Sequence, residues 1–76
     1  MLPIEFRLTS AFIALNDLLK VTGVCASGGA GKALVAAGSV RVDGAVETRK
    51  TRKIRAGQSV RVGDVEIRVL GRDPAK

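Results

Sequence analysis

The sequence predicts an α+β domain in which two short helices pack on a small antiparallel sheet. Three observations predict this fold class. Apolar residues repeat at helical spacing between residues 12 and 38, they alternate with polar residues after residue 38, and Asp-Gly and Gly-Asp pairs separate the alternating stretches as turns do. Because 76 residues have room for one hydrophobic core, residues 1–76 are expected to form a single domain, with residues 71–76 as a tail.

The first 23 residues are expected to form a strand and a helix. Apolar and polar side chains alternate over residues 4–8, which is the pattern of a strand with one buried face. Thr9 or Ser10 can cap a helix that Gly23 ends. The apolar stripe of this helix would consist of Phe12, Leu15, Leu18 and Leu19.

A second helix is expected between Ser27 and Gly38. The Ser27 hydroxyl can accept a hydrogen bond from the first turn, and Gly38 is a common type of C-terminal stop. The apolar stripe would consist of Ala30, Leu34 and Ala37. Cys25 lies in the turn before this helix, where we interpret it as a small packing residue.

The chain after residue 38 is expected to form antiparallel strands. Asp43-Gly44 is a strong turn signal inside an alternating stretch. A three-residue loop with a bulge would pair Val42 with Val46, whereas a two-residue loop would pair Val42 with Ala45. We favour the three-residue loop.

Gly63-Asp64 is the second turn signal and predicts a two-residue hairpin. This register pairs Val62 with Val65 on the apolar face. It also places Arg61 opposite Glu66 on the solvent face, which is a favourable pair of charges. The apolar and ionic patterns therefore support the same hairpin.

Positive charge is concentrated in the second half of the chain. The 13 lysines and arginines exceed the seven acidic residues by a net charge of +6, and residues 41–76 hold ten of these cations. Five of them lie in one segment that has no acidic residue, namely Arg49, Lys50, Arg52, Lys53 and Arg55. The segment predicts an exposed basic loop with a polyanionic partner, and a merely solvated surface is the alternative.

The aromatic content bears on which nucleic acid would bind. The chain has no tyrosine or tryptophan, and both phenylalanines lie at apolar positions of the pattern. No aromatic platform is therefore expected for stacking single-stranded bases. A protein rich in phosphate-directed cations and poor in aromatics should recognise the backbone of helical or folded RNA.

A glycine-rich stretch opens the expected second helix at residues 28–32. It does not match a nucleotide-binding loop, because Ala26 and Ala33 stand where that loop requires Gly and Ser or Thr. The helix start can still receive an RNA phosphate, with Ser27 and Lys32 as donors. A flexible glycine linker beside an exposed lysine is the alternative.

Catalysis and membrane insertion find little support in the sequence. There is no histidine, one cysteine and only scattered acidic residues, so we expect no enzyme activity, small-molecule substrate, cofactor or metal site. The longest mainly apolar stretch, residues 11–19, is too short to span a membrane, and the N-terminus has no secretory signal pattern. We expect a cytoplasmic protein without membrane binding.

These motifs resemble the RNA-binding domain that is named after ribosomal small-subunit protein S-four. The resemblance covers residues 14–62. The residues after the Asp-Gly turn are most similar to the small stand-alone subgroup called YbcJ-like. The residues that carry it are Leu15, Leu19, Gly23, Ser27, Leu34, Val35, Gly38, Val40, Val42, Asp43 and Gly44. The chain departs from the pattern at Ala14 and Gly28, where the family usually carries arginines that touch RNA.

The resemblance implies a bacterial, non-catalytic accessory factor that grips structured RNA, with ribosomal or transfer RNA as its partner. We expect a ribosome-associated monomer. The expected RNA-binding residues are Ser27, Lys32, Arg49, Lys50, Arg52, Lys53 and Arg55. The alternative is a protein-interaction module that docks its basic loop on an acidic partner.

Overall fold

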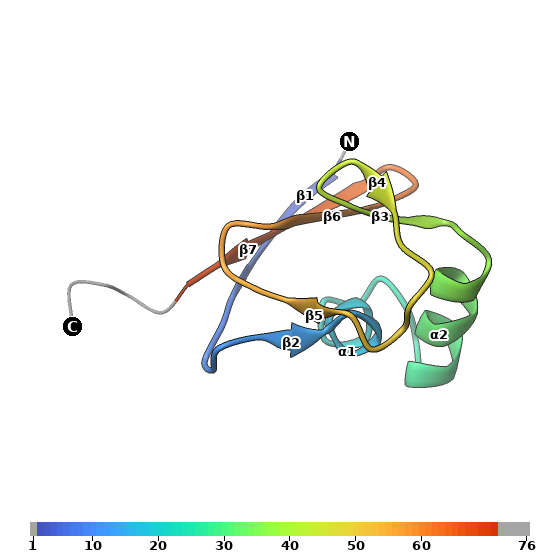
Figure 1. The fold of residues 1–76 in the computed structure, drawn as a ribbon, viewed down its shortest axis with the longest axis horizontal. Coiled ribbons are helices and arrows are strands. Elements are labelled where there is room, and N and C mark those ends of the chain that lie inside the picture. The colour runs from blue at the N-terminus through green and yellow to red at the C-terminus, as the bar shows by residue number, and fades with distance from the viewer. Residues whose placement is uncertain (1, 72–76) are drawn as a thin grey trace.

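The computed structural model describes residues 2–71 (Figure 1). Its helices are α1 (Leu15–Val21) and α2 (Gly28–Ala36). Its strands are β1 (Leu2–Arg7), β2 (Ile13–Ala14), β3 (Val40–Val42), β4 (Ala45–Val46), β5 (Lys53–Ile54), β6 (Ser59–Val62) and β7 (Val65–Leu70). The expected α+β architecture is confirmed, while residues 72–76 of the expected tail lie outside the described residues. Neither helix in the described part is long and apolar enough to cross a membrane.

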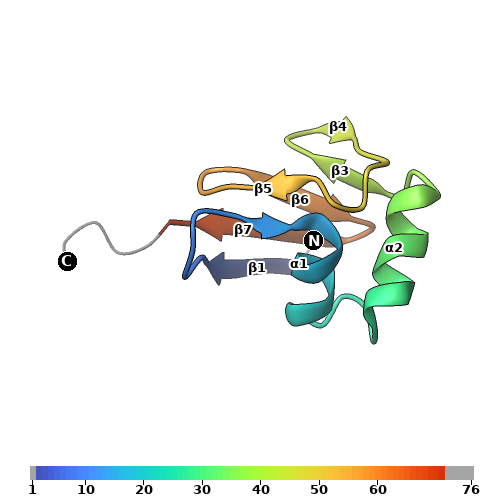
Figure 2. The ribbon, with the colours of Figure 1, turned by 60° about the horizontal axis from the view of Figure 1, so that its bottom comes forward.

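Five strands form one sheet in the order β1-β7-β6-β3-β4, and β2 pairs with β5 in a separate ribbon (Figure 2). β1 and β7 are parallel, with Ile4 opposite Ile67, whereas the other pairs are antiparallel. The sheet is therefore mixed, not wholly antiparallel as expected. Apolar alternation in β1 indicates a buried face but carries no information about the direction of the partner strand.

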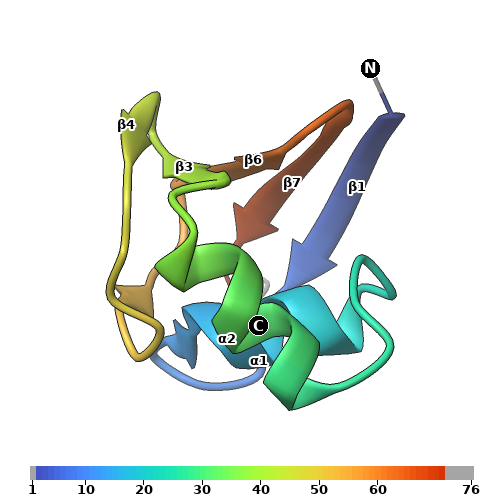
Figure 3. The same cartoon turned by 90° about the vertical axis from the view of Figure 1, so that its right-hand side faces the viewer.

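The hydrophobic core lies between the inner face of the five-stranded sheet and the helices. Both helices lie on the same side of this sheet (Figure 3). The largest fully buried side chains of the described residues are Leu15, Leu18, Leu19, Val35, Val40, Ile54, Val60, Ile67 and Val69. The stripe expected for the first helix is thus confirmed for its three leucines, and Cys25 is buried beside it.

The hairpin of β6 and β7 is confirmed in its expected register. Val62 pairs with Val65 and Arg61 with Glu66 across the two-residue Gly63-Asp64 turn. The local sequence was sufficient here because the turn residues and both strand faces agree on a single register.

The three-residue loop that we favoured between β3 and β4 is wrong. Val42 pairs with Ala45, so Asp43-Gly44 forms a two-residue turn. Both turn residues have positive φ, +52° at Asp43 and +86° at Gly44, as in a type I′ turn. The Asp43 carboxylate accepts hydrogen bonds from the Ser59 N–H at 2.9 Å and the Gln58 amide at 3.1 Å. These contacts with residues distant in sequence stabilise a conformation that Asp43 adopts less readily than glycine does.

Helix α1 begins at Leu15, so the expected caps at Thr9 and Ser10 are wrong. Ala14 occupies the N-cap position without a side-chain hydrogen bond, and it belongs to β2. The carbonyl oxygens of Arg52 and Lys50 accept hydrogen bonds from the first two helical N–H groups instead. Phe12 consequently lies outside the helix and is 38% exposed.

Helix α2 starts at its expected cap, since the Ser27 Oγ accepts a hydrogen bond from the Ala30 N–H at 3.2 Å. Gly38, with φ +77°, follows the helix end as expected. The expected stripe is wrong at Ala30 and Ala37, which are exposed. The buried helix residues are Gly31 and Val35, because α2 crosses α1 closely at a glycine.

Candidate nucleic-acid interface

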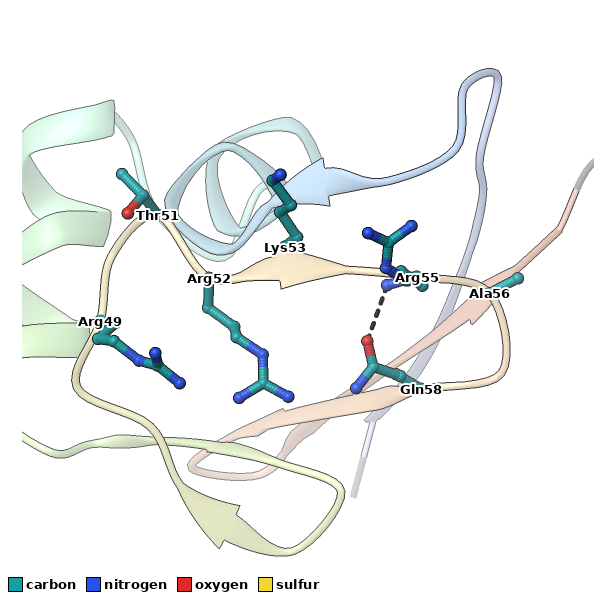
Figure 4. A pocket seen from close by; sticks show the side chains of 7 residues that line it. All are labelled: Arg49, Thr51, Arg52, Lys53, Arg55, Ala56 and Gln58. Carbon is teal, nitrogen blue, oxygen red and sulfur yellow. Dashed lines mark hydrogen bonds between the residues drawn. The ribbon is translucent and has the colours of Figure 1, made fainter.

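The basic segment lines an open hollow of about 660 Å³ (Figure 4). Its lining residues are Arg49, Thr51, Arg52, Lys53, Arg55, Ala56 and Gln58. Four of the five cations predicted from this segment therefore line the same open hollow, from its two sides. In Figure 4, Arg49 and Arg52 point toward the β3–β4 side, whereas Lys53 and Arg55 point toward the β2 side.

The backbone of this segment is fixed against helix α1. The N–H groups of Leu15 and Asn16 donate to the carbonyl oxygens of Arg52 and Lys50, at 2.9 and 3.0 Å. These contacts satisfy two N–H groups that a helix start leaves without intrahelical partners. The basic segment thus caps α1 through its main chain, and its side chains project from an anchored backbone.

The expectation of a simple exposed loop is wrong for part of the segment. Lys53 and Ile54 form β5, in which Ile54 is completely buried opposite Ile13 of β2. One isoleucine among cations gives no alternating pattern, so the sequence alone did not indicate this strand.

Glu47 belongs to the site, although its sequence context did not distinguish it from the other scattered acidic residues. It is only 8% exposed. Its Oε1 accepts a hydrogen bond from Arg52 Nη1 at 2.6 Å, and its Oε2 accepts from the backbone N–H and Nε of Arg49 at 2.9 and 3.2 Å. The segment itself has no acidic residue, but this neighbouring carboxylate neutralises part of its charge and orients two arginines.

These contacts also shift the ionisation of Glu47. Hydrogen bonds from the backbone and side chain of Arg49, with a further one from Arg52, lower the pKa of Glu47 from 4.5 to about 2 despite the opposing effect of burial. Glu47 is therefore ionised at neutral pH. Its short spacing to Arg49 and Arg52 is the only sequence signal for this cluster, and such spacings are common in charged segments.

Lys53 and Arg55 form the second half of the cationic surface. Neither has an acidic partner within 4.0 Å among the described residues. Lys53 lies directly across the ribbon from Ala14. The Lys53 Nζ and the Arg55 Cζ lie 4.9 and 5.6 Å from the centre of the Phe12 ring. Phe12, which was expected on the apolar stripe of the first helix, is thus exposed beside two cations.

Gln58 ties the hollow to the turn between β3 and β4. Its Oε1 accepts a hydrogen bond from the Arg55 N–H at 2.8 Å, and its Nε2 donates to Asp43 Oδ2 at 3.1 Å. Neither Gln58 nor Asp43 was predicted to belong to the site. Both are polar residues beside turns, where a purely structural role is the usual expectation.

The remaining predicted residues do not line the hollow. Lys50 is exposed and contributes its carbonyl oxygen to α1. Ser27 and Lys32 are exposed on helix α2, where the Ser27 Oγ already accepts the capping hydrogen bond. No group of three His, Cys, Asp or Glu side chains that could hold a metal ion occurs within residues 2–71.

Comparison with known proteins identifies the family. A family model described as S4 domain matches residues 6–70. The chain belongs to the S4 domain family. It is 48% identical over 58 residues to YbcJ of Escherichia coli strain K12, whose name carries RNA binding as a provisional assignment. The match covers 76% of this chain and 83% of that protein.

A second YbcJ protein and a solved structure of E. coli YbcJ are also similar to this chain. YbcJ of Shigella flexneri, whose name assigns no function, is also 48% identical over 58 residues, with the same coverage of 76% and 83%. The solution structure of YbcJ from E. coli, described as revealing an alfa-L motif involved in RNA binding, superimposes with a TM-score of 0.66. That match has 41% identity and covers 92% of this chain and 87% of the other.

Proposed function

We propose that this S4 domain is a non-catalytic RNA-binding protein that grips the backbone of structured RNA. The observation that carries the proposal is that four cations line one open hollow and project from a backbone that caps helix α1. The names of the YbcJ relatives support RNA as the partner. The proposed contact residues are Ser27, Lys32, Arg49, Lys50, Arg52, Lys53 and Arg55.

The two halves of the hollow suit phosphate groups in different ways. Arg49 and Arg52 are held by Glu47, yet a guanidinium has five N–H donors and retains several for a phosphate. Lys53 and Arg55 have no acidic partner among the described residues and provide the uncompensated charge. The hollow thus combines oriented donors with a net positive field.

Lys53 also bears on the missing family arginine at Ala14. Because the two residues are direct neighbours across the β2–β5 ribbon, Lys53 presents a cation beside that position. Lys32 and the capped start of α2 would extend the contact surface beyond the hollow. We infer that the RNA surface is shifted toward β5 and retains its charge.

The proposed cellular role is that of an accessory factor in the bacterial cytoplasm. It would act as a monomer on ribosomal or transfer RNA, in association with the ribosome. The support for this setting is membership of the S4 domain family.

The salt dependence of RNA binding tests the proposal. About five phosphate contacts should give a log-log slope near −4, so affinity for a blunt RNA duplex should fall roughly 100- to 500-fold between 50 and 200 mM salt. The double variant Lys53→Gln with Arg55→Gln should flatten the slope by about 1.5 units. The control Lys20→Gln with Arg68→Gln removes two exposed cations outside the hollow and should keep the parent slope.

Circular dichroism of each variant separates lost binding from lost folding. If the folded Lys53 and Arg55 variant keeps both affinity and slope, the hollow is not the RNA site. If the parent protein binds no RNA but captures an acidic protein through these cations, the chain is a protein-interaction module instead.

A further inference from the structure

We propose that Phe12 forms a stacking site for one unpaired nucleobase at the edge of the cationic hollow. The inference rests on the proposed RNA binding and adds to it a specific element of the RNA. Because the Phe12 ring is apolar, the charge pattern of the sequence does not indicate that it belongs to an RNA-binding surface.

The β2–β5 ribbon determines which way the ring faces. Ile13 pairs with the completely buried Ile54, so this side of the ribbon faces the core. Phe12 directly precedes β2 and Arg55 directly follows β5. Side chains alternate along an extended chain, which places Phe12 on the opposite side with Lys53 and Arg55. The distances of 4.9 and 5.6 Å from these cations to the ring centre agree with this placement.

Core packing does not account for an aromatic ring at this position. Phe12 is 38% exposed, whereas the second phenylalanine, Phe6, is partly buried and packs against the core. The Ser10 hydroxyl donates a hydrogen bond to the Phe12 carbonyl oxygen at 2.8 Å, and β2 follows directly. The exposed ring is therefore presented from a backbone held on both sides.

A ring beside two cations matches the chemistry of a single nucleotide. The base can stack on the ring face, and the lysine and arginine can take the phosphates that flank it. Contacts between cations and an exposed ring are weaker than base stacking, so a base can displace the side chains that now lie over the ring. An acidic peptide would bring negative charge to the ring's negative face and is a poorer match.

The number of rings limits the ligand to one base. Phe12 is the only exposed aromatic side chain in the described residues, so a run of stacked single strand has no further platform. The ligand is accordingly an unpaired nucleotide, such as a bulge, within an otherwise paired RNA. Stacking accepts any base, so no sequence preference is expected.

The test compares a blunt RNA duplex with the same duplex carrying one unpaired 2-aminopurine nucleotide. The parent protein should bind the bulged duplex about 5- to 30-fold more tightly and quench the 2-aminopurine fluorescence. Phe12→Leu keeps an apolar side chain without a ring, so it should lose the preference and the quenching while binding the blunt duplex as before. Phe12→Tyr keeps the ring and should retain both.

Equal affinity of the parent protein for the two duplexes, or quenching that survives Phe12→Leu, would overturn the stacking site. The blunt duplex tests the proposed function separately. That function is contradicted if the parent protein shows no salt-dependent binding to the blunt duplex. Salt-dependent binding without a bulge preference would thus leave the cationic hollow as the RNA site and remove only Phe12 from it. Circular dichroism and the unchanged binding of the blunt duplex verify that Phe12→Leu is folded.

Discussion

Glu47 shows how one buried carboxylate can organise a basic surface. It accepts hydrogen bonds from Arg49 and Arg52 while Lys53 and Arg55 remain outside its reach among the described contacts. Without Glu47, neighbouring like charges would repel one another and the arginine side chains would sample many rotamers. We infer that Glu47 is a positioning residue for the proposed RNA contacts.

The lowered pKa of Glu47 predicts a dependence of stability on pH. Because its pKa is 4.5 ordinarily and about 2 in the folded protein, its contribution to stability is complete above pH 4.5 and is lost as the pH falls toward 2. Glu47→Gln should therefore be less stable than the parent at neutral pH and have a flatter stability profile between pH 4.5 and 2. Thermal unfolding followed by circular dichroism measures both profiles.

Glu5→Gln is the matched control, since it neutralises an exposed carboxylate on β1. Its profile should keep the shape of the parent profile. If Glu47→Gln and Glu5→Gln give the same profile, the ion pairs of Glu47 do not contribute to stability in solution.

Two features stabilise the position of helix α2, namely its serine cap and its close crossing with α1. A Cβ atom at Gly31 would lie 3.1 Å from the carbonyl oxygen of Asn16, which belongs to the backbone of α1. A Cβ at Gly29 would meet only the Ser27 Oγ, at 3.9 Å. The two glycines therefore respond to alanine in opposite ways.

Gly29→Ala should raise the free energy of unfolding by about 0.5 kcal/mol, because alanine restricts the unfolded chain and favours helix. Gly31→Ala has the same gain in helix propensity, but its Cβ must push one helix away from the other. It should therefore lower the free energy of unfolding by about 1 kcal/mol. Urea denaturation of both variants measures the difference. An equal gain in both variants would mean that the helix crossing can relax without cost.

The Ser27 cap can be separated from the proposed phosphate contact. Ser27→Ala removes the hydrogen bond to the Ala30 N–H and should cost about 1 kcal/mol. Ser27→Asp preserves the cap, so its stability should stay within about 0.5 kcal/mol of the parent, but its negative charge should weaken RNA binding. Urea denaturation and RNA titration measure the two effects. Unchanged RNA affinity in Ser27→Asp would remove this helix start from the interface.

At the scale of the whole molecule, the parallel pairing of β1 with β7 joins the two ends of the described chain. Leu8 continues this ladder, as its N–H donates to the Leu70 carbonyl oxygen at 2.8 Å. The Leu8 side chain is 3% exposed and belongs to the core. The segment that carries the family resemblance, residues 14–62, therefore depends on packing from outside itself.

Leu8→Ala should lower the free energy of unfolding by about 2–4 kcal/mol, because it leaves a cavity in a core that has few side chains to relax into it. Val46→Ala removes an apolar side chain that is 53% exposed and should stay within about 0.5 kcal/mol of the parent. Thermal and urea unfolding provide the comparison. Similar small losses in both variants would show that residues 14–62 form a sufficient core by themselves.

Features whose signals lie close together in the chain could be predicted from the amino-acid sequence alone. The Ser27 cap, the Gly63-Asp64 hairpin and the three leucines of α1 each depend on residues within a few positions of one another. The family followed from motifs of the same local kind. The cationic segment of the candidate site was equally visible, since charge density is a property of composition.

The contacts between these parts became visible in the three-dimensional fold. Three features involve residues that are far apart in the chain. They are the parallel pairing of β1 with β7, the capping of α1 by the carbonyl groups of Lys50 and Arg52, and the hydrogen bonds of Asp43 to residues 58 and 59. The same holds for the exposure of Phe12 beside Lys53. Local sequence patterns indicate which side chains are apolar or charged. The interaction partners of those side chains depend on how the chain reverses direction, which no short stretch of sequence contains. A cation looks the same in sequence whether it is paired, stacked on a ring or open to phosphate.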